Sequence, residues 1–142
     1  MGFYSKHILP NLINIACKAS SLTKQREKII PFAAGNVLEI GVGTGLNLPF
    51  YNSKNITQLT AIDPYEETWQ KRTIDIRKLD YKFEFIKASA EELPFKNNTF
   101  DTIVITYSLC TIPDAGKALR EMSRVLKPNG ILIFCEHGAA PD

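Results

Sequence analysis

The feature that most constrains this fold is an apolar run that ends in three alternating glycines. Residues 36–40 read Asn-Val-Leu-Glu-Ile, and Gly41, Gly43 and Gly45 follow at every second position. Glycine at such positions permits positive φ angles and lets a ligand approach the backbone, whose N–H groups can hold a polar group. A tight turn between a strand and a helix needs fewer glycines. The spacing therefore favours a ligand-binding loop after a buried strand.

Short apolar runs alternate with helical or loop segments along the rest of the chain. Five such runs predict strands, at Asn36–Ile40, Gln58–Ile62, Phe83–Lys87, Thr102–Thr106 and Ile131–Cys135. Apolar strands of this length are typical of sheets covered on both faces, and intervening helices imply parallel βαβ crossovers. We expect a single α/β domain, with residues 1–34 as an N-terminal helical cap and residues 35–142 as a Rossmann-like core.

The clearest predicted helix covers residues 114–127. One face of it carries six apolar side chains at helical spacing, namely Ala115, Ala118, Leu119, Met122, Val125 and Leu126. Asp114 is a suitable N-cap, and the sequence Pro-Asn-Gly at 128–130 ends the helix. Less regular patterns predict three further helices, at Tyr65–Leu79, Leu22–Phe32 and Ile8–Ala19.

Composition and charge exclude several classes of protein. The chain has 142 residues, of which 44% are hydrophobic, and this is enough for one domain with a buried core. A formal net charge of +2 gives no electrostatic reason to expect a nucleic-acid partner. No apolar run approaches the roughly 20 residues of a membrane span. Cys17, Cys110 and Cys135 lie apart in or beside apolar stretches, which predicts buried free thiols and a cytoplasmic location.

Two acidic residues accompany the glycine loop. Glu39 lies two residues before Gly41, and Asp63 ends the next predicted strand, 63 − 41 = 22 residues after Gly41. In Rossmann-type folds a carboxylate about 20 residues after the first glycine binds the ribose hydroxyls. A dinucleotide loop, however, requires glycine at position 46, where Leu46 stands, and the Gly-Lys-Ser/Thr of a Walker phosphate loop is absent.

These blocks resemble the class I S-adenosylmethionine-dependent methyltransferases. The first motif of that family is similar to Glu39-x-Gly41-x-Gly43-x-Gly45, and residues 100–106 and 119–130 continue the resemblance in the family's order. Residues 108–112 and 136–140 resemble a narrower branch, the small-molecule and thiol methyltransferase-like proteins with their soluble bacterial members. The resemblance implies a three-layer αβα sandwich with sheet order 3-2-1-4-5, S-adenosylmethionine as cofactor and S-adenosylhomocysteine as product.

The resemblance also implies which residues bind the cofactor. They are Glu39, Gly41, Gly43, Gly45, Asn47, Asp63, Pro64, Ala90, Glu91 and Thr106. Ala90 and Glu91 would lie against the adenine ring. His137, just past the fifth predicted strand, is the candidate catalytic base, because imidazole exchanges protons near neutral pH. A histidine with a structural hydrogen bond fits that position equally well. No metal site is predicted.

The segment after the fourth predicted strand limits the acceptor. Thr106-Tyr107-Ser108-Leu109 lacks the Pro-Pro of amino-group methyltransferases of adenine, and Cys110 lacks the preceding proline of cytosine C5 methyltransferases. We expect Cys110 to line the pocket or the core. What remains is a small, apolar acceptor: a thiol, an amine, a hydroxyl or a quinone-like ring. Two alternatives stay open, a cofactor-binding protein that is inactive or regulatory and, less favoured, an NAD(P)-dependent oxidoreductase.

Methyltransferases of this class normally add two more strands after the fifth, and this chain ends seven residues after Cys135. The predicted strand Ile131–Cys135 would then lie at the edge of the sheet, with a wholly apolar sequence. An exposed apolar edge strand is a template for pairing with another chain. We expect a partner subunit, as in a homo-oligomer, or residues outside this chain to cover it.

Overall fold

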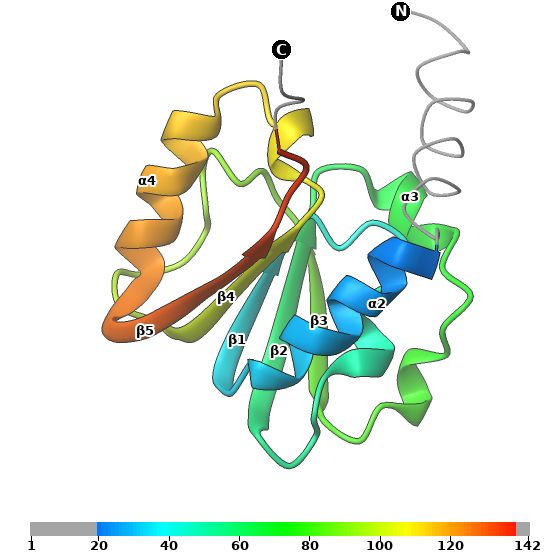
Figure 1. The fold of residues 1–142 in the computed structure, drawn as a ribbon. Helices are drawn as coiled ribbons and strands as arrows, with labels where there is room; N and C mark the ends of the chain where they lie inside the picture. Colours follow the sequence, from blue (N-terminus) through cyan, green and yellow to red (C-terminus); the bar gives the residue numbers. More distant parts are fainter. Residues whose placement is uncertain (1–19, 139–142) are drawn as a thin grey trace, which may run out of the picture.

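The computed structural model describes residues 20–138, which form one parallel sheet with helices on both faces (Figure 1). Its strands are β1 (Gly35–Ile40), β2 (Ile56–Asp63), β3 (Lys82–Lys87), β4 (Phe100–Thr106) and β5 (Leu126–Cys135). They lie in the order β3-β2-β1-β4-β5, which confirms the predicted topology. The strands β2 and β3 lie on one side of β1, and β4 and β5 lie on the other. The carboxyl ends of β1 and β4 therefore border the crevice where open α/β sheets bind ligands.

Helices cover the two faces unequally. On one face lie α2 (Ser20–Ile29), the short η2 (Ile30–Phe32) and α3 (Glu66–Gln70), whereas α4 (Ala115–Val125) covers the other (Figure 1). Side chains of β1 alternate between the faces as a strand requires. Val37 packs in the cluster on the α2 side, and Leu38 and Ile40 pack in the cluster on the α4 side.

The three central strands are buried and the two edge strands are half exposed. The prediction of burial on both faces is therefore confirmed for β1, β2 and β4 and wrong for β3 and β5. Ile131, Leu132 and Phe134 are exposed on β5, the last of them by 66%. Only one strand neighbours each edge strand, so fewer side chains are available to cover it.

The predicted helix Tyr65–Leu79 is confirmed at its start, where α3 lies, and wrong beyond Gln70. The helix α3 ends at Gln70, and a separate 3₁₀ turn, η4 (Ile76–Lys78), follows. Asp75 begins that turn because its carboxylate accepts a hydrogen bond from the Arg77 N–H at 3.1 Å. The predicted helix 114–127 is confirmed but ends at Val125, since Leu126 already pairs with Phe100.

The N-terminal predictions fall partly within the described residues. The predicted helix Leu22–Phe32 corresponds to α2 and η2, while the predicted helix Ile8–Ala19 and Cys17 lie outside the described residues. In the part of the chain that the structure describes, no helix is both long and apolar enough to cross a membrane. Cys110 and Cys135 are free thiols, as predicted, but neither is buried: Cys110 is exposed and Cys135 is half-buried.

Candidate functional site

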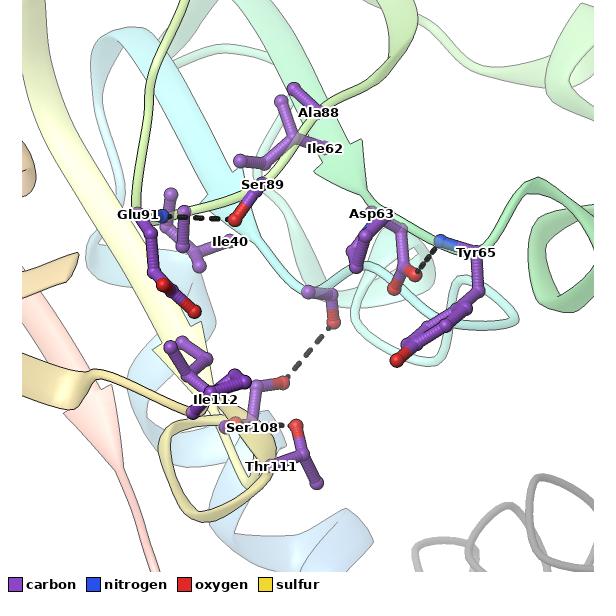
Figure 2. A pocket seen from close by; sticks show the side chains of 14 residues that line it. Ile40, Ile62, Asp63, Tyr65, Ala88, Ser89, Glu91, Ser108, Thr111 and Ile112 are labelled. Carbon is purple, nitrogen blue, oxygen red and sulfur yellow. Dashed lines mark hydrogen bonds between the residues drawn. The ribbon is translucent and has the colours of Figure 1, made fainter. Parts of the chain in front are cut away.

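A pocket opens at the carboxyl ends of β1, β2 and β4 (Figure 2). Its lining comes from four segments: Ile40 and Gly41, Ile62 to Tyr65, Ala88 to Glu91, and Ser108 with Thr111, Ile112 and Pro113. The predicted cofactor-binding set contributes five of these residues, namely Gly41, Asp63, Pro64, Ala90 and Glu91. The topology therefore gathers predicted residues as far apart in the sequence as Gly41 and Glu91, 91 − 41 = 50 positions, around one cavity.

Asp63 is the acidic side chain that joins the pocket to the glycine loop. One carboxylate oxygen accepts the Gly43 N–H at 3.0 Å, and the other accepts the Tyr65 N–H at 2.9 Å. Burial raises the pKa of Asp63, and the two amide hydrogen bonds oppose that rise. Each carboxylate oxygen has a second lone pair. Asp63 therefore keeps acceptor capacity towards a ligand in the pocket.

Glycine is required at positions 41 and 43 of the loop for different structural reasons. Gly41 has a φ angle of +70°, and a Cβ atom there would lie 2.5 Å from the Ser108 hydroxyl oxygen. Gly43 has a φ angle of +55°, but a Cβ atom there would meet no heavy atom of the described residues within 4 Å. Gly41 thus allows two chain segments to pack closely, whereas Gly43 leaves open space beside the loop for a ligand.

A buried polar network lies under the loop on the α2 side of the sheet. Glu39 accepts hydrogen bonds from the Asn47 amide at 3.0 Å and from the Tyr51 hydroxyl at 2.8 Å. The same Asn47 amide nitrogen donates to the Thr106 hydroxyl at 3.0 Å, and its carbonyl oxygen accepts the Arg26 Nε–H at 2.9 Å. All five residues are buried. The network connects α2, β1, the glycine loop and β4.

Burial controls the protonation of this network. Removal from water raises the pKa of Glu39 to about 7, against the opposing hydrogen bonds from Tyr51 and Asn47 and the nearby Arg26 charge. Among the predicted cofactor-binding residues, Glu39, Asn47 and Thr106 do not line the pocket, and neither do Gly43 and Gly45. Direct contact of these five with a cofactor stays a prediction.

The sequence reasoning missed two members of the network. Arg26 lies on α2 and donates to Asn47, 21 residues away, and Tyr51 donates to Glu39, 12 residues away. No sequence signal indicates Arg26, which is one of several charged residues in α2 and the one that the fold buries. No local pattern distinguishes Tyr51 from the neighbouring aromatic residue Phe50.

The turn after β4 brings an aromatic residue beside His137. Tyr107 has a φ angle of +50°, and its ring lies 4.9 Å from the His137 ring and 5.0 Å from the Arg26 guanidinium carbon. His137 is exposed and does not line the pocket, so its catalytic role stays a prediction.

The expectation that Cys110 lines the pocket or core is wrong. The 3₁₀ turn η5 (Leu109–Thr111) packs Leu109 inward and leaves Cys110 exposed.

Comparisons with known proteins agree on one family. The methyltransferase domain family matches residues 38–134. The thiol S-methyltransferase TMT1B of Mus musculus is 36% identical over 130 residues, which are 84% of this chain and 52% of that protein. The ubiquinone/menaquinone biosynthesis C-methyltransferase UbiE of Rickettsia prowazekii is 36% identical over 115 residues, which are 75% of this chain and 46% of that protein.

A solved structure supports the same grouping. The S-adenosylmethionine-dependent methyltransferase from Aquifex aeolicus has a TM-score of 0.69 and 28% identity, over 88% of this chain and 71% of that one. The chain spans about half the length of the curated relatives it matches, 52% and 46% in the two cases above.

Proposed function

Because this chain belongs to the class I S-adenosylmethionine-dependent methyltransferases, we propose that it transfers a methyl group from that cofactor to a small acceptor. S-adenosylmethionine is the cofactor of the family, and it supplies a methyl group that is already activated by a sulfonium. The observation that carries the proposal is the position of Asp63, whose carboxylate lines the pocket and is hydrogen bonded to the Gly43 amide at 3.0 Å.

The pocket residues suit the parts of this cofactor. Asp63 retains lone pairs for the ribose hydroxyls, and the open space beside Gly43 admits a ligand close to the loop backbone. Ile40 and Ile62 give the pocket apolar surface, on which an adenine ring can pack. Ala90 and Glu91 lie on the same wall, where we assign them to that ring and its exocyclic amine. Figure 2 shows the Glu91 carboxylate on the side of the pocket near Ile112, and one of its oxygens accepts the Asp114 N–H at 3.5 Å.

We assign a supporting role to the predicted residues outside the lining. Glu39, Asn47 and Thr106 hold the glycine loop from below through the buried network. Gly45 permits close packing, since a Cβ atom there would lie 3.0 Å from Leu48 Cδ1. These residues would influence cofactor affinity through the shape of the loop and need no contact of their own.

In the reaction, alignment of the acceptor is the main task of the protein, since the methyl carbon is already activated. His137 is the proposed general base: its imidazole takes the proton from a thiol or hydroxyl acceptor as the acceptor attacks. The Tyr107 ring, 4.9 Å away, orients that imidazole. A thiol or quinone-like acceptor is supported by the names of two relatives, a thiol S-methyltransferase and a C-methyltransferase of ubiquinone/menaquinone biosynthesis. A cytoplasmic location belongs to the proposal, since Cys110 and Cys135 are free thiols.

Calorimetric titration tests the cofactor assignment. We expect S-adenosylhomocysteine to bind the chain and NAD to give no heat. Asp63→Ala should weaken binding by about 1–3 kcal/mol, the scale of hydrogen bonds to a charged group. Asp80→Ala, which removes an exposed carboxylate outside the pocket, is the matched control and should bind as the unmodified chain does. Binding of NAD without S-adenosylhomocysteine would contradict the proposal.

Turnover is tested separately from binding. A panel of small thiols, phenols, amines and quinones, with S-adenosylmethionine, should yield at least one methylated product. His137→Ala should lower turnover of protonated acceptors and leave the affinity for S-adenosylhomocysteine unchanged, because His137 does not line the pocket. Cofactor binding with no product from any acceptor would favour the inactive or regulatory alternative.

A further inference from the structure

A carboxylate just past the end of β5 holds the turn that follows β4. One oxygen of Glu136 accepts hydrogen bonds from two consecutive backbone N–H groups, those of Ser108 and Leu109, each at 3.1 Å. This contact joins the two short segments, 108–112 and 136–140, that the sequence analysis singled out. Neither the proposed cofactor contacts nor the proposed base accounts for Glu136.

The turn needs this outside acceptor. Tyr107 enters it with a φ angle of +50°, a backbone conformation that is unfavourable for a residue other than glycine. The first N–H groups of a helical turn have no partner within the turn. Ser108 occupies the N-cap position of η5 but makes no side-chain cap there. Glu136 therefore supplies from β5 the acceptor that a capping side chain would otherwise supply.

The Ser108 hydroxyl is committed to the glycine loop instead. It donates to the Gly41 carbonyl oxygen at 3.3 Å and lies 3.0 Å from the Thr106 carbonyl oxygen. The two segments are packed closely, since a Cβ atom on Gly41 would lie 2.5 Å from the Ser108 hydroxyl oxygen. A shift of the turn would therefore change the pocket at the glycine loop as well.

The turn is also one wall of the pocket. Ser108, Thr111, Ile112 and Pro113 line it opposite Asp63 and Tyr65, as Figure 2 shows for the labelled residues. The Thr111 hydroxyl donates to the Ser108 carbonyl oxygen at 2.7 Å, so the wall residues are tied to the residue that Glu136 holds. The contacts run in sequence from Glu136 through Ser108 to Gly41.

We propose that Glu136 is a positioning residue for the cofactor pocket: by accepting from the Ser108 and Leu109 amides it fixes the 107–113 wall against Gly41. The inference rests on the proposed function, because it takes the pocket to be the cofactor site. Glu136 acts through the turn and needs no contact with the cofactor.

Two substitutions separate this role from a contribution to overall stability. Glu136→Ala removes the acceptor, and we expect the Kd for S-adenosylhomocysteine to rise about tenfold, as the loss of a hydrogen bond to a charged group does. Amide exchange at Ser108 and Leu109 should accelerate about tenfold or more in the free protein. Glu136→Gln keeps a carbonyl oxygen that can accept from both amides, so its Kd should stay within about threefold of the unmodified chain.

Glu84→Ala is the matched control, because Glu84 is an exposed glutamate on β3 outside the pocket lining. It should change neither the Kd nor the exchange at Ser108 and Leu109. Unchanged Kd and exchange in Glu136→Ala would overturn the proposal, and so would a folded Glu136→Gln that binds as weakly as Glu136→Ala. A merely structural role would lower the thermal midpoint in Glu136→Ala and leave the Kd of the folded protein unchanged.

Two further outcomes are distinguishable. If the unmodified chain binds no S-adenosylhomocysteine, the proposed function fails and the pocket role falls with it, while exchange at Ser108 still reports whether Glu136 holds the turn. If Glu136→Ala does not fold, Glu136→Asp takes its place. The shorter side chain draws the carboxylate back from both amides, so its Kd must rise for the proposal to stand.

Discussion

Two carboxylates on adjacent strands, Glu39 on β1 and Asp63 at the end of β2, have opposite surroundings. Glu39 is 1% exposed and accepts from the side chains of Asn47 and Tyr51 in a buried network. Asp63 lines the pocket and accepts from the backbone amides of Gly43 and Tyr65. The sequence assigns both to the cofactor. The difference shows that one acidic residue supports the loop from within the protein, while the other lines the pocket that we propose for the cofactor.

This division of roles separates two kinds of measurement. Changes on the pocket side should alter ligand affinity and leave stability nearly unchanged. Changes in the network under the loop should mainly lower the free energy of unfolding. They should alter ligand affinity only indirectly, through the shape of the loop.

The largest effect is expected at Gly43 on the ligand side. Gly43→Val should abolish binding of S-adenosylhomocysteine in calorimetry, because the side chain fills the open space beside the loop and is disfavoured at a φ angle of +55°. The matched control is Gly138→Val, where a Cβ atom also meets no described atom within 4 Å and no positive φ applies. Near-normal affinity in Gly43→Val would show that the loop does not approach the ligand there.

The largest effect on stability is expected at Asn47, in the network. Asn47→Asp places a second carboxylate against Glu39 and removes the amide donor to Thr106, so the free energy of unfolding should fall by about 3–5 kcal/mol in urea titrations. Asn52→Asp adds the same charge at an exposed site and keeps the acceptor for the Lys54 N–H. A loss below about 1 kcal/mol would mean that the network contributes little.

The pH dependence of stability tests Glu39 directly. Its pKa is raised to about 7 by burial, so the folded state binds the proton more tightly than the unfolded state, where the value is 4.5. Protonated Glu39 therefore contributes on the order of 3 kcal/mol to the free energy of unfolding. This contribution is complete below about pH 4.5 and is lost as the pH rises through about 7. Glu39→Gln cannot titrate and should remove this decline in urea unfolding between pH 5 and pH 8. Equal slopes in both proteins would contradict the assignment.

The smallest effect is expected on self-association through β5, the edge strand, which neither the pocket nor the buried network covers. Phe134 is 66% exposed on this strand, and Phe32 is 72% exposed on η2. Sedimentation should detect self-association of the chain that Phe134→Lys weakens, because a charge on an edge strand opposes pairing with another chain. Phe32→Lys should leave the self-association unchanged. A monodisperse monomer before any substitution would contradict the prediction.

More of the sheet than of the pocket could be predicted from the sequence. Short apolar runs mark the five strands, since even a strand with one covered face leaves a local pattern of apolar residues. Their order came from the family resemblance. The predicted helix at 65–79 failed because the Asp75 carboxylate, which accepts from the Arg77 amide, begins a new turn inside it. Asp75 lies only two residues before the amide that it binds, so this local signal was present in the sequence and the helix prediction overlooked it.

The roles of the site residues were harder to predict than their positions. Asp63 and Gly41 line the pocket as the motif indicates. Glu39 does not line the pocket, because it is bound within the buried network. The motif could not reveal this, since Tyr51, and Arg26 through Asn47, come from segments that carry no motif. The contact of Glu136 with Ser108 spans 28 residues, and tertiary structure alone reveals it. The motifs predict which residues gather at the carboxyl ends of the strands, and the side-chain partners determine the role of each residue.

Chemical-shift mapping of the backbone amides tests the central claim, that the pocket beside Asp63 holds the cofactor, most directly. On titration with S-adenosylhomocysteine, the account predicts the largest shifts at Gly41, Gly43, Tyr65 and Glu91, with smaller shifts at Tyr51 under the loop. Saturable binding with the largest shifts outside this set, on β3 or at the β5 edge, would contradict the account.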